Sequence, residues 1–102
     1  MTRKIVLSKR ASVNLEKLIE YLEIKWSEKV KDEFIKKLDK ALRILKNKPE
    51  SSPESEILKG LHKCVVTKQT TVFYKFDDNH LFVVTIFDTR QEPKKLNKEV
   101  QE

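Results

Sequence analysis

Lysines gather around a series of short segments rich in valine, threonine and aromatic residues. The segment 57–76 contains neither aspartate nor glutamate but has four lysines: Lys59, Lys63, Lys68 and Lys75. Arg90 follows further along the chain. Because ammonium and guanidinium groups bind phosphate oxygens and carboxylates, these five residues are predicted to contact a target or a phosphate group. Such contacts position a phosphate but do not by themselves cleave it.

Cleavage of a phosphodiester would also need a base and an acid. His62 and His80 are candidates because an unperturbed imidazole titrates near neutral pH, although histidines beside strands and turns more often have no catalytic role. Tyr74 lies in an alternating apolar segment and is predicted to be a core residue with a hydrogen-bonded hydroxyl. Cys64 is predicted to be a small buried hydrophobic residue in a strand rather than a nucleophile.

The elements before these residues are predicted to be one strand and two helices. Residues 3–7 form a short strand, and Ser8 caps a helix that runs to about Trp26. Ser27 caps a second helix over residues 28–47. Because Ser27 is almost the only residue between them, the helices are predicted to form an antiparallel hairpin, with Trp26 closing it or anchoring a partner.

Three strands are predicted between His62 and Arg90, in an antiparallel meander. The middle strand places alternate residues on one side, which is predicted to face the helices: Thr70, Val72, Tyr74 and Phe76. Residues 81–87 are apolar on both faces, so this last strand should be central. The fold class is therefore α+β: an N-terminal strand, an antiparallel helical hairpin and a three-stranded antiparallel meander.

Two turns have specific predicted conformations. Gly60, the single glycine, is expected to have a positive φ just before the sheet. Asp78 and Asn79 are expected to form a tight turn between the last two strands, because aspartate and asparagine tolerate the left-handed region.

Length and composition narrow the class of protein. The 102 residues are predicted to form one domain, residues 1–102, with residues 94–102 as a mobile tail. The net charge of +6 comes from the first half of the chain and suits an acidic partner. No apolar run is long enough to span a membrane, and the N-terminus is not that of a secretory signal. The single cysteine can make neither an internal disulfide nor a zinc motif, so the expected compartment is the cytoplasm. No metal or cofactor is expected.

The order of these elements resembles the ParE/RelE superfamily of toxins from bacterial type II toxin–antitoxin modules, often labelled plasmid stabilisation proteins. The resemblance covers roughly residues 3–93 and includes Gly60-Leu61-His62-Lys63, the strand 70–74 and the closing Phe87-Asp88-Thr89-Arg90. It implies the RelE/ParE-like fold and a toxin neutralised by a cognate acidic antitoxin.

The resemblance leaves the target to be decided between two branches. RelE-like members cut messenger RNA on the ribosome, using a middle-strand arginine, lysines before the sheet, and an arginine and a tyrosine near the C-terminus. Here the middle-strand position is Thr71, and no tyrosine follows Arg90. These departures favour the ParE-like branch, whose members poison DNA gyrase by binding.

Two alternatives remain at this stage. The first is a metal-independent, ribosome-dependent endoribonuclease that uses Arg90, Lys63 and His62. The second is a non-toxic superfamily member that acts only in a complex.

Overall fold

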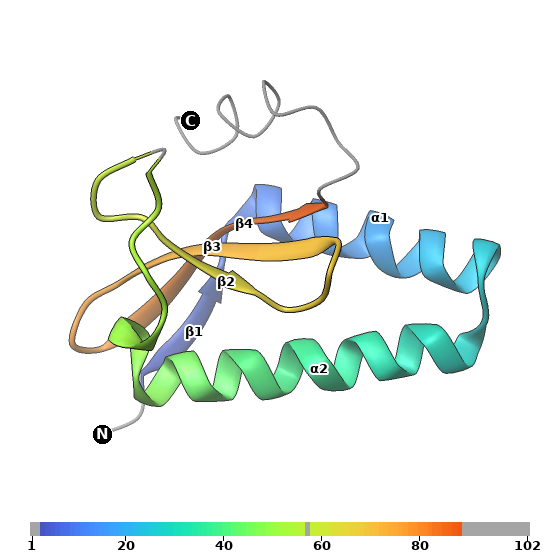
Figure 1. Cartoon of the computed structure of the whole chain (residues 1–102), viewed down its shortest axis with the longest axis horizontal. Helices are drawn as coiled ribbons and strands as arrows, with labels where there is room; N and C mark the ends of the chain where they lie inside the picture. Colours follow the sequence, from blue (N-terminus) through green and yellow to red (C-terminus); the bar gives the residue numbers. More distant parts are fainter. Residues whose placement is uncertain (1–2, 57, 89–102) are drawn as a thin grey trace.

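The computed structural model describes residues 3–56 and 58–88, and these form two helices and one mixed sheet (Figure 1). Arg90 and the predicted tail therefore lie outside the described residues. The elements, in chain order, are β1 (Lys4–Leu7), α1 (Lys9–Lys25), α2 (Glu28–Asn47), the short 3₁₀ helix η1 (Pro49–Ser51), β2 (His62–Val65), β3 (Thr70–Phe76) and β4 (His80–Asp88). The predicted α+β class and the predicted order of elements are confirmed.

The strands form a sheet in the order β1-β4-β3-β2. Strands β2, β3 and β4 make the predicted antiparallel meander, and β1 pairs in parallel with β4. Parallel pairing needs a long crossover, which the two helices supply. Strand β4 therefore has a neighbour on both sides, as its apolar sequence predicted.

A serine side chain caps the N-terminus of each helix. The hydroxyl oxygen of Ser8 accepts a hydrogen bond from the amide of Ala11 at 2.9 Å, and that of Ser27 accepts one from the amide of Val30 at 3.1 Å. Each bond satisfies an amide that has no partner within its helix. The Ser8 hydroxyl also donates to the carbonyl of Val84 at 2.6 Å, which ties the start of α1 to β4 where β1 ends.

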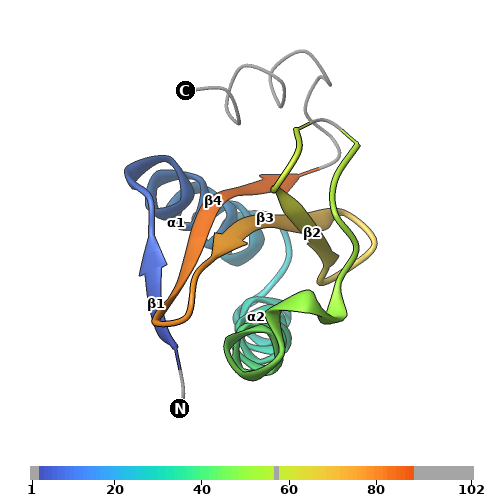
Figure 2. The ribbon, with the colours of Figure 1, turned by 90° about the vertical axis from the view of Figure 1, so that its left-hand side faces the viewer.

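Both helices pack against one face of the sheet (Figure 2). Their buried residues Leu18, Phe34, Leu38 and Leu45 join a core with buried residues of β3 and β4, which are Val72, Tyr74, Leu81, Val83 and Ile86. Phe76 packs at its margin, so the predicted inward side of β3 is confirmed. The hydroxyl of Tyr74 donates to the carbonyl of Pro49 at 2.5 Å, and burial raises the pKa of this tyrosine.

The opposite face of the sheet is partly covered by the loop before β2. Leu61, Phe73 and Phe87 are buried together there, with Leu58 and Val84 against them. Gly60 has a φ of 85°, as predicted, so the loop can reverse direction before it enters the sheet. We call this side of the sheet the outer face, and the side that packs on the helices the inner face.

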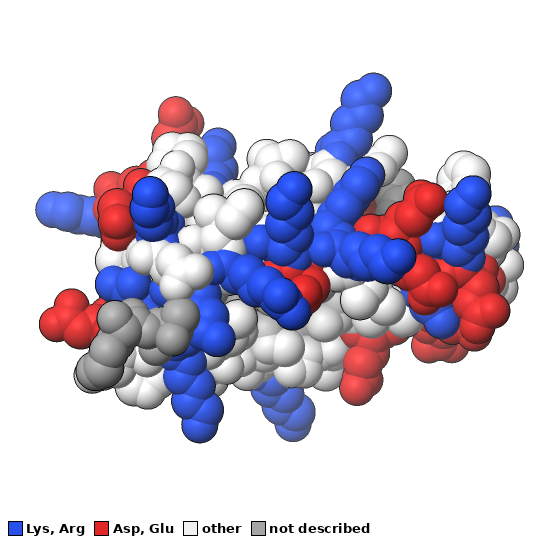
Figure 3. Space-filling view, turned by 90° about the horizontal axis from the view of Figure 1, so that it is seen from below, with Lys and Arg blue, Asp and Glu red and all other residues white. Residues whose placement is uncertain are grey.

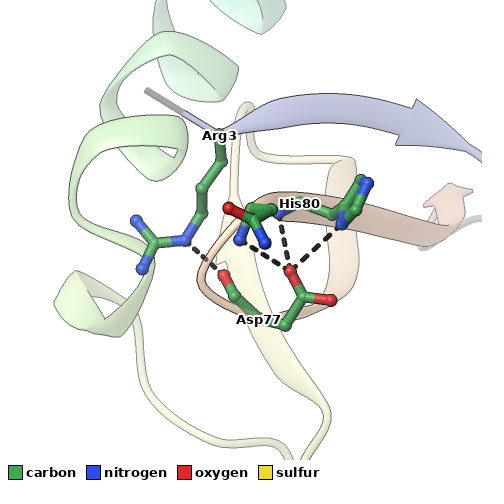
Figure 4. Close-up of polar contacts among 4 residues, drawn as sticks. Arg3, Asp77 and His80 are labelled. Carbon is green, nitrogen blue, oxygen red and sulfur yellow. Dashed lines mark hydrogen bonds and ion pairs between the residues drawn. The ribbon is translucent and has the colours of Figure 1, made fainter. Parts of the chain in front are cut away.

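The turn between β3 and β4 differs from the prediction. None of the described residues other than glycine has a positive φ, so Asp78 and Asn79 are not left-handed. Instead, the carboxylate of Asp77 accepts hydrogen bonds from the amides of Asn79 and His80, at 2.8 and 2.7 Å (Figure 4). This side chain closes the turn by replacing a backbone acceptor, which removes the need for a left-handed residue.

The hydrogen bonds to the Asp77 carboxylate should make the stability of the fold depend on pH. Hydrogen bonds from the Asn79 amide, and then from His80, lower the pKa of this carboxyl. The stabilisation is therefore present above the ordinary carboxyl pKa and is lost as the pH falls through the lowered folded-state pKa. Asp77→Ala should reduce the melting temperature at neutral pH, and by less at about pH 3, which lies below the ordinary carboxyl pKa. An equal reduction at both values would contradict this assignment.

Arg3, just before β1, contacts the end of α2 and the end of β3 with its following turn. Its Nε donates to the carbonyl of Asp77 at 2.6 Å, its Nη1 donates to the carbonyl of Lys46 at 3.4 Å, and its guanidinium lies 5.6 Å from the centre of the Phe76 ring. Arg3→Ala should therefore reduce the unfolding free energy by about 1 kcal/mol. Thermal unfolding should show a decrease of about 4–8 °C in melting temperature. Lys17→Ala, an exposed change on α1, serves as the control and should have little effect.

Candidate functional site

The predicted cations fall into separate groups on the structure. Lys63 and Lys75 both point to the outer face, on the neighbouring strands β2 and β3, where Lys63 pairs with Phe73. Lys59 is exposed in the loop that precedes β2. Lys68 is exposed in the turn at the opposite end of β2, so it is separated from the other three.

His62 and Lys63 point to opposite faces of β2, because successive side chains of a strand alternate. The His62 ring lies on the inner face, with its centre 5.4 Å from that of Tyr74 and 5.2 Å from that of Phe76. Its Nδ1 is 2.8 Å from the carbonyl oxygen of Ser52. A phosphate held by Lys63 on the outer face would therefore lie on the other side of the strand from this imidazole.

Thr71 occupies the middle-strand position that an arginine takes in the RNA-cleaving branch. It points to the outer face between Val65 and Phe87, and 9% of its surface is exposed. Its hydroxyl has no positive charge to place against a phosphate. Among the described strand residues, the outer face therefore offers lysines to an anion and no arginine.

Two hollows lie along α2, and of the residues that line them only Trp26 was named from the sequence as a possible anchor for a partner. One hollow of about 350 Å³ lies at the end where the helices join and is lined by Leu18, Leu22, Trp26, Val30, Glu33, Phe34, Lys37, Thr67, Gln69 and Thr70. A second hollow of about 300 Å³ lies between α2 and β2 and is lined by Lys37, Lys40, Ala41, Ile44, Leu45, Ser51, Ser52 and residues 64–66. Lys37 borders both hollows, and we call this pair of hollows beside α2 the α2 groove.

Large hydrophobic side chains border the α2 groove yet remain exposed. Trp26 is 65% exposed, Ile44 is 51% exposed and Val65 is 67% exposed. Trp26 lines the first hollow and Ile44 lines the second, while Val65 lies beside the second on β2 with its side chain toward the outer face. Such residues beside a concave apolar surface are typical of a protein interface.

The edge of β2 next to this groove is only partly covered. Lys63 donates its amide to the carbonyl of Pro53 at 3.0 Å, and the Ser55 amide donates to the carbonyl of Leu61 at 2.5 Å. This short bridge covers the start of β2, which is the last strand of the sheet formed by the described residues. The backbone around Val65 is therefore a place where a further strand can add.

Comparison with known proteins shows the family of this chain. A family model described as the ParE toxin of the type II toxin–antitoxin system parDE matches residues 5–93. The chain belongs to this ParE toxin family. A search of curated proteins found no match.

Three solved structures share the fold of this ParE-family chain. The chromosomal ParDE TA system from P. aeruginosa gives a TM-score of 0.70 at 8% identity, over 85% of this chain and 96% of the other. The E. coli DinJ-YafQ toxin–antitoxin complex gives 0.60 at 16% identity, over 88% and 96%. The YoeB dimer from Staphylococcus aureus gives 0.61 at 16% identity, over 85% and 97%. The expected ParE/RelE resemblance is confirmed.

The charges around the α2 groove of this ParE-family chain are separated along its length. Figure 3 shows lysine and arginine side chains over the middle of the face formed by α2, and acidic side chains near the junction of the helices. At that junction, the ammonium of Lys31 lies 3.6 Å from Glu23, 3.8 Å from Glu28 and 3.9 Å from Asp32. The middle of the groove therefore attracts carboxylates, and the junction of the helices does not.

Within residues 3–56 and 58–88, no three histidine, cysteine, aspartate or glutamate side chains gather as a metal site would require. None of the helices described there is long and apolar enough to cross a membrane.

Proposed function

We propose that this ParE-family toxin acts by binding and inhibiting a large cellular target, DNA gyrase, rather than by cleaving RNA. The observation that carries the proposal is the separation of His62 from Lys63 by the thickness of the sheet. A general base must come within about 3 Å of the proton that it removes, directly or through one water. In this geometry the imidazole contacts Tyr74 and Phe76 instead of the outer face.

Thr71 supports the same proposal. Stabilisation of the charge that develops on a phosphate is usually the largest contribution to cleavage, and it needs cations fixed in advance. A threonine that is 9% exposed supplies no such charge. The lysines of the outer face remain suited to binding an anionic surface, which a gyrase–DNA complex presents.

We propose further that a cognate acidic antitoxin occupies the α2 groove. Its apolar side chains would fill the two hollows, and its carboxylates would meet Lys37 and Lys40 at the border of the groove. A short extended segment can also pair with the free edge of β2 near Val65. These contacts combine apolar burial with charge complementarity, which are the two requirements of a specific interface.

Induction of the chain in bacteria without an antitoxin tests this function. Growth should stop, plasmid supercoiling should change, and the 5′ ends of cellular transcripts should match those of uninduced cells. New transcript ends that are abolished by Lys63→Ala and His62→Ala would instead establish the endoribonuclease. Unimpaired growth with normal protein levels would support a non-toxic family member.

A further inference from the structure

An aromatic and basic surface lies on the outer face at the end of the sheet that carries the β3–β4 turn. Parallel pairing places Lys4 opposite His80 and Val6 opposite Phe82, and antiparallel pairing places Lys75 opposite Phe82 on the other side. Ile5, Leu81 and Phe76 alternate with these residues and belong to the inner-face core. The alternation therefore brings Lys4, Val6, Lys75, His80 and Phe82 to one exposed surface.

Two stacked rings form the centre of this surface. The ring centres of His80 and Phe82 are 5.2 Å apart, and the ring planes differ by 23°. Phe82 is 37% exposed although it lies in β4, a strand with a neighbour on both sides. A nucleobase can stack on an exposed ring of this kind because every base has a flat π face.

Lysines lie on both sides of the rings. Lys4 is on β1 and Lys75 on β3, each next to β4, so each backbone is about 4.8 Å from that of β4. Both side chains are exposed, and no residue from Lys4 to Val6 or from His80 to Phe82 is acidic. The carboxylate of Asp77, in the adjacent turn, already accepts from two backbone amides and lies 3.2 Å from the Nδ1 of His80 (Figure 4). The strands at this end therefore present positive charge beside the rings.

We propose that this surface binds a short single-stranded nucleic acid. One base stacks on Phe82, and the phosphates on either side of that base contact Lys4 and Lys75. Exposed aromatic rings flanked by cations on an open sheet face suit single strands, whose bases are free to stack. An acidic protein segment would use the lysines but would have no need of the exposed ring. The proposal goes beyond the inhibition of gyrase, shares only Lys75 with the outer-face lysines invoked there, and uses none of the residues that line the α2 groove.

Fluorescence anisotropy of labelled oligonucleotides tests the proposal with the full chain at low salt. The probes are an oligothymidine of about eight nucleotides, an abasic strand of equal length and charge, and a polyglutamate peptide. The oligothymidine should bind about 5-fold or more tightly than the abasic strand, because stacking on one ring supplies the difference. Equal binding of the oligothymidine and the abasic strand, or tighter binding of the peptide, would overturn the proposal.

Substitutions on this surface distinguish the contribution of stacking to binding from the contribution of charge. Phe82→Leu keeps an apolar side chain but removes the π face, so the two strands should bind equally, whereas Phe82→Tyr should preserve the preference for thymidine. Lys75→Gln should weaken the binding of both oligonucleotides. It should also reduce the slope of log affinity against log salt concentration by about 0.7. Lys36→Gln, on the solvent side of α2, is the matched control and should change neither quantity. A thymidine preference that survives Phe82→Leu in a folded protein would disprove stacking at this site.

Discussion

Replacement of Leu45 by alanine is expected to reduce the unfolding free energy by about 3 kcal/mol, because the change leaves a cavity in a packed core. Leu45 is 1% exposed and packs in the inner-face core, where α2 meets the sheet. Domains of this size have a total stability of about 5–15 kcal/mol. Urea unfolding should therefore show a much lower midpoint with an unchanged slope.

The neighbouring residue provides the control for this prediction. Ile44 precedes Leu45 on the same helix but is 51% exposed at the border of the α2 groove. Ile44→Ala should therefore cost less than about 1 kcal/mol. If both variants lost the same stability, the orientation of α2 against the sheet would be wrong.

The second large effect is expected on antitoxin binding. Lys37 borders both hollows of the α2 groove, so Lys37→Glu places a negative charge where the acidic partner should lie. The affinity of the complex should fall by about 10-fold to 100-fold, through repulsion and the loss of an attractive pair. Titration calorimetry of the toxin with its antitoxin would measure this change, and higher salt should reduce the difference.

Lys9→Glu is the control for this charge reversal. Lys9 is an exposed residue at the start of α1 and lines neither hollow, so its reversal changes the net charge equally without altering the groove. The antitoxin should bind this variant with nearly the affinity of the unchanged toxin. Equal weakening by both variants would show that net charge, and not the groove, determines the affinity.

Much of the fold was predictable because local signals agreed with one another. Ser8 and Ser27 cap the helices as expected, and the alternation in β3 identified Val72 and Tyr74 as inward residues. The turn at Asp77 was predicted with the wrong conformation, because composition does not reveal which acceptor a carboxylate will replace. The pairing of Lys4 with His80 joins distant parts of the chain, and no local pattern encodes it.

The candidate site was less predictable than the fold. Strand alternation already separates His62 from Lys63, so this signal was present in the sequence. The α2 groove depends on how β2 packs beside α2, which is a long-range arrangement. The exposed hydrophobic residues Trp26, Ile44 and Val65 were its signal, but they define a surface only when the helix and strand are placed together.

Supercoiling of relaxed plasmid by purified DNA gyrase is the measurement that tests the central claim most directly. The purified toxin should reduce supercoiling in proportion to its concentration, and prior addition of the antitoxin should restore it. The His62→Ala toxin should inhibit as strongly, because His62 contacts Tyr74 and Phe76 within the fold and has no catalytic role in the proposed activity. Gyrase activity that stays unchanged with excess folded toxin would show that the toxin does not inhibit gyrase.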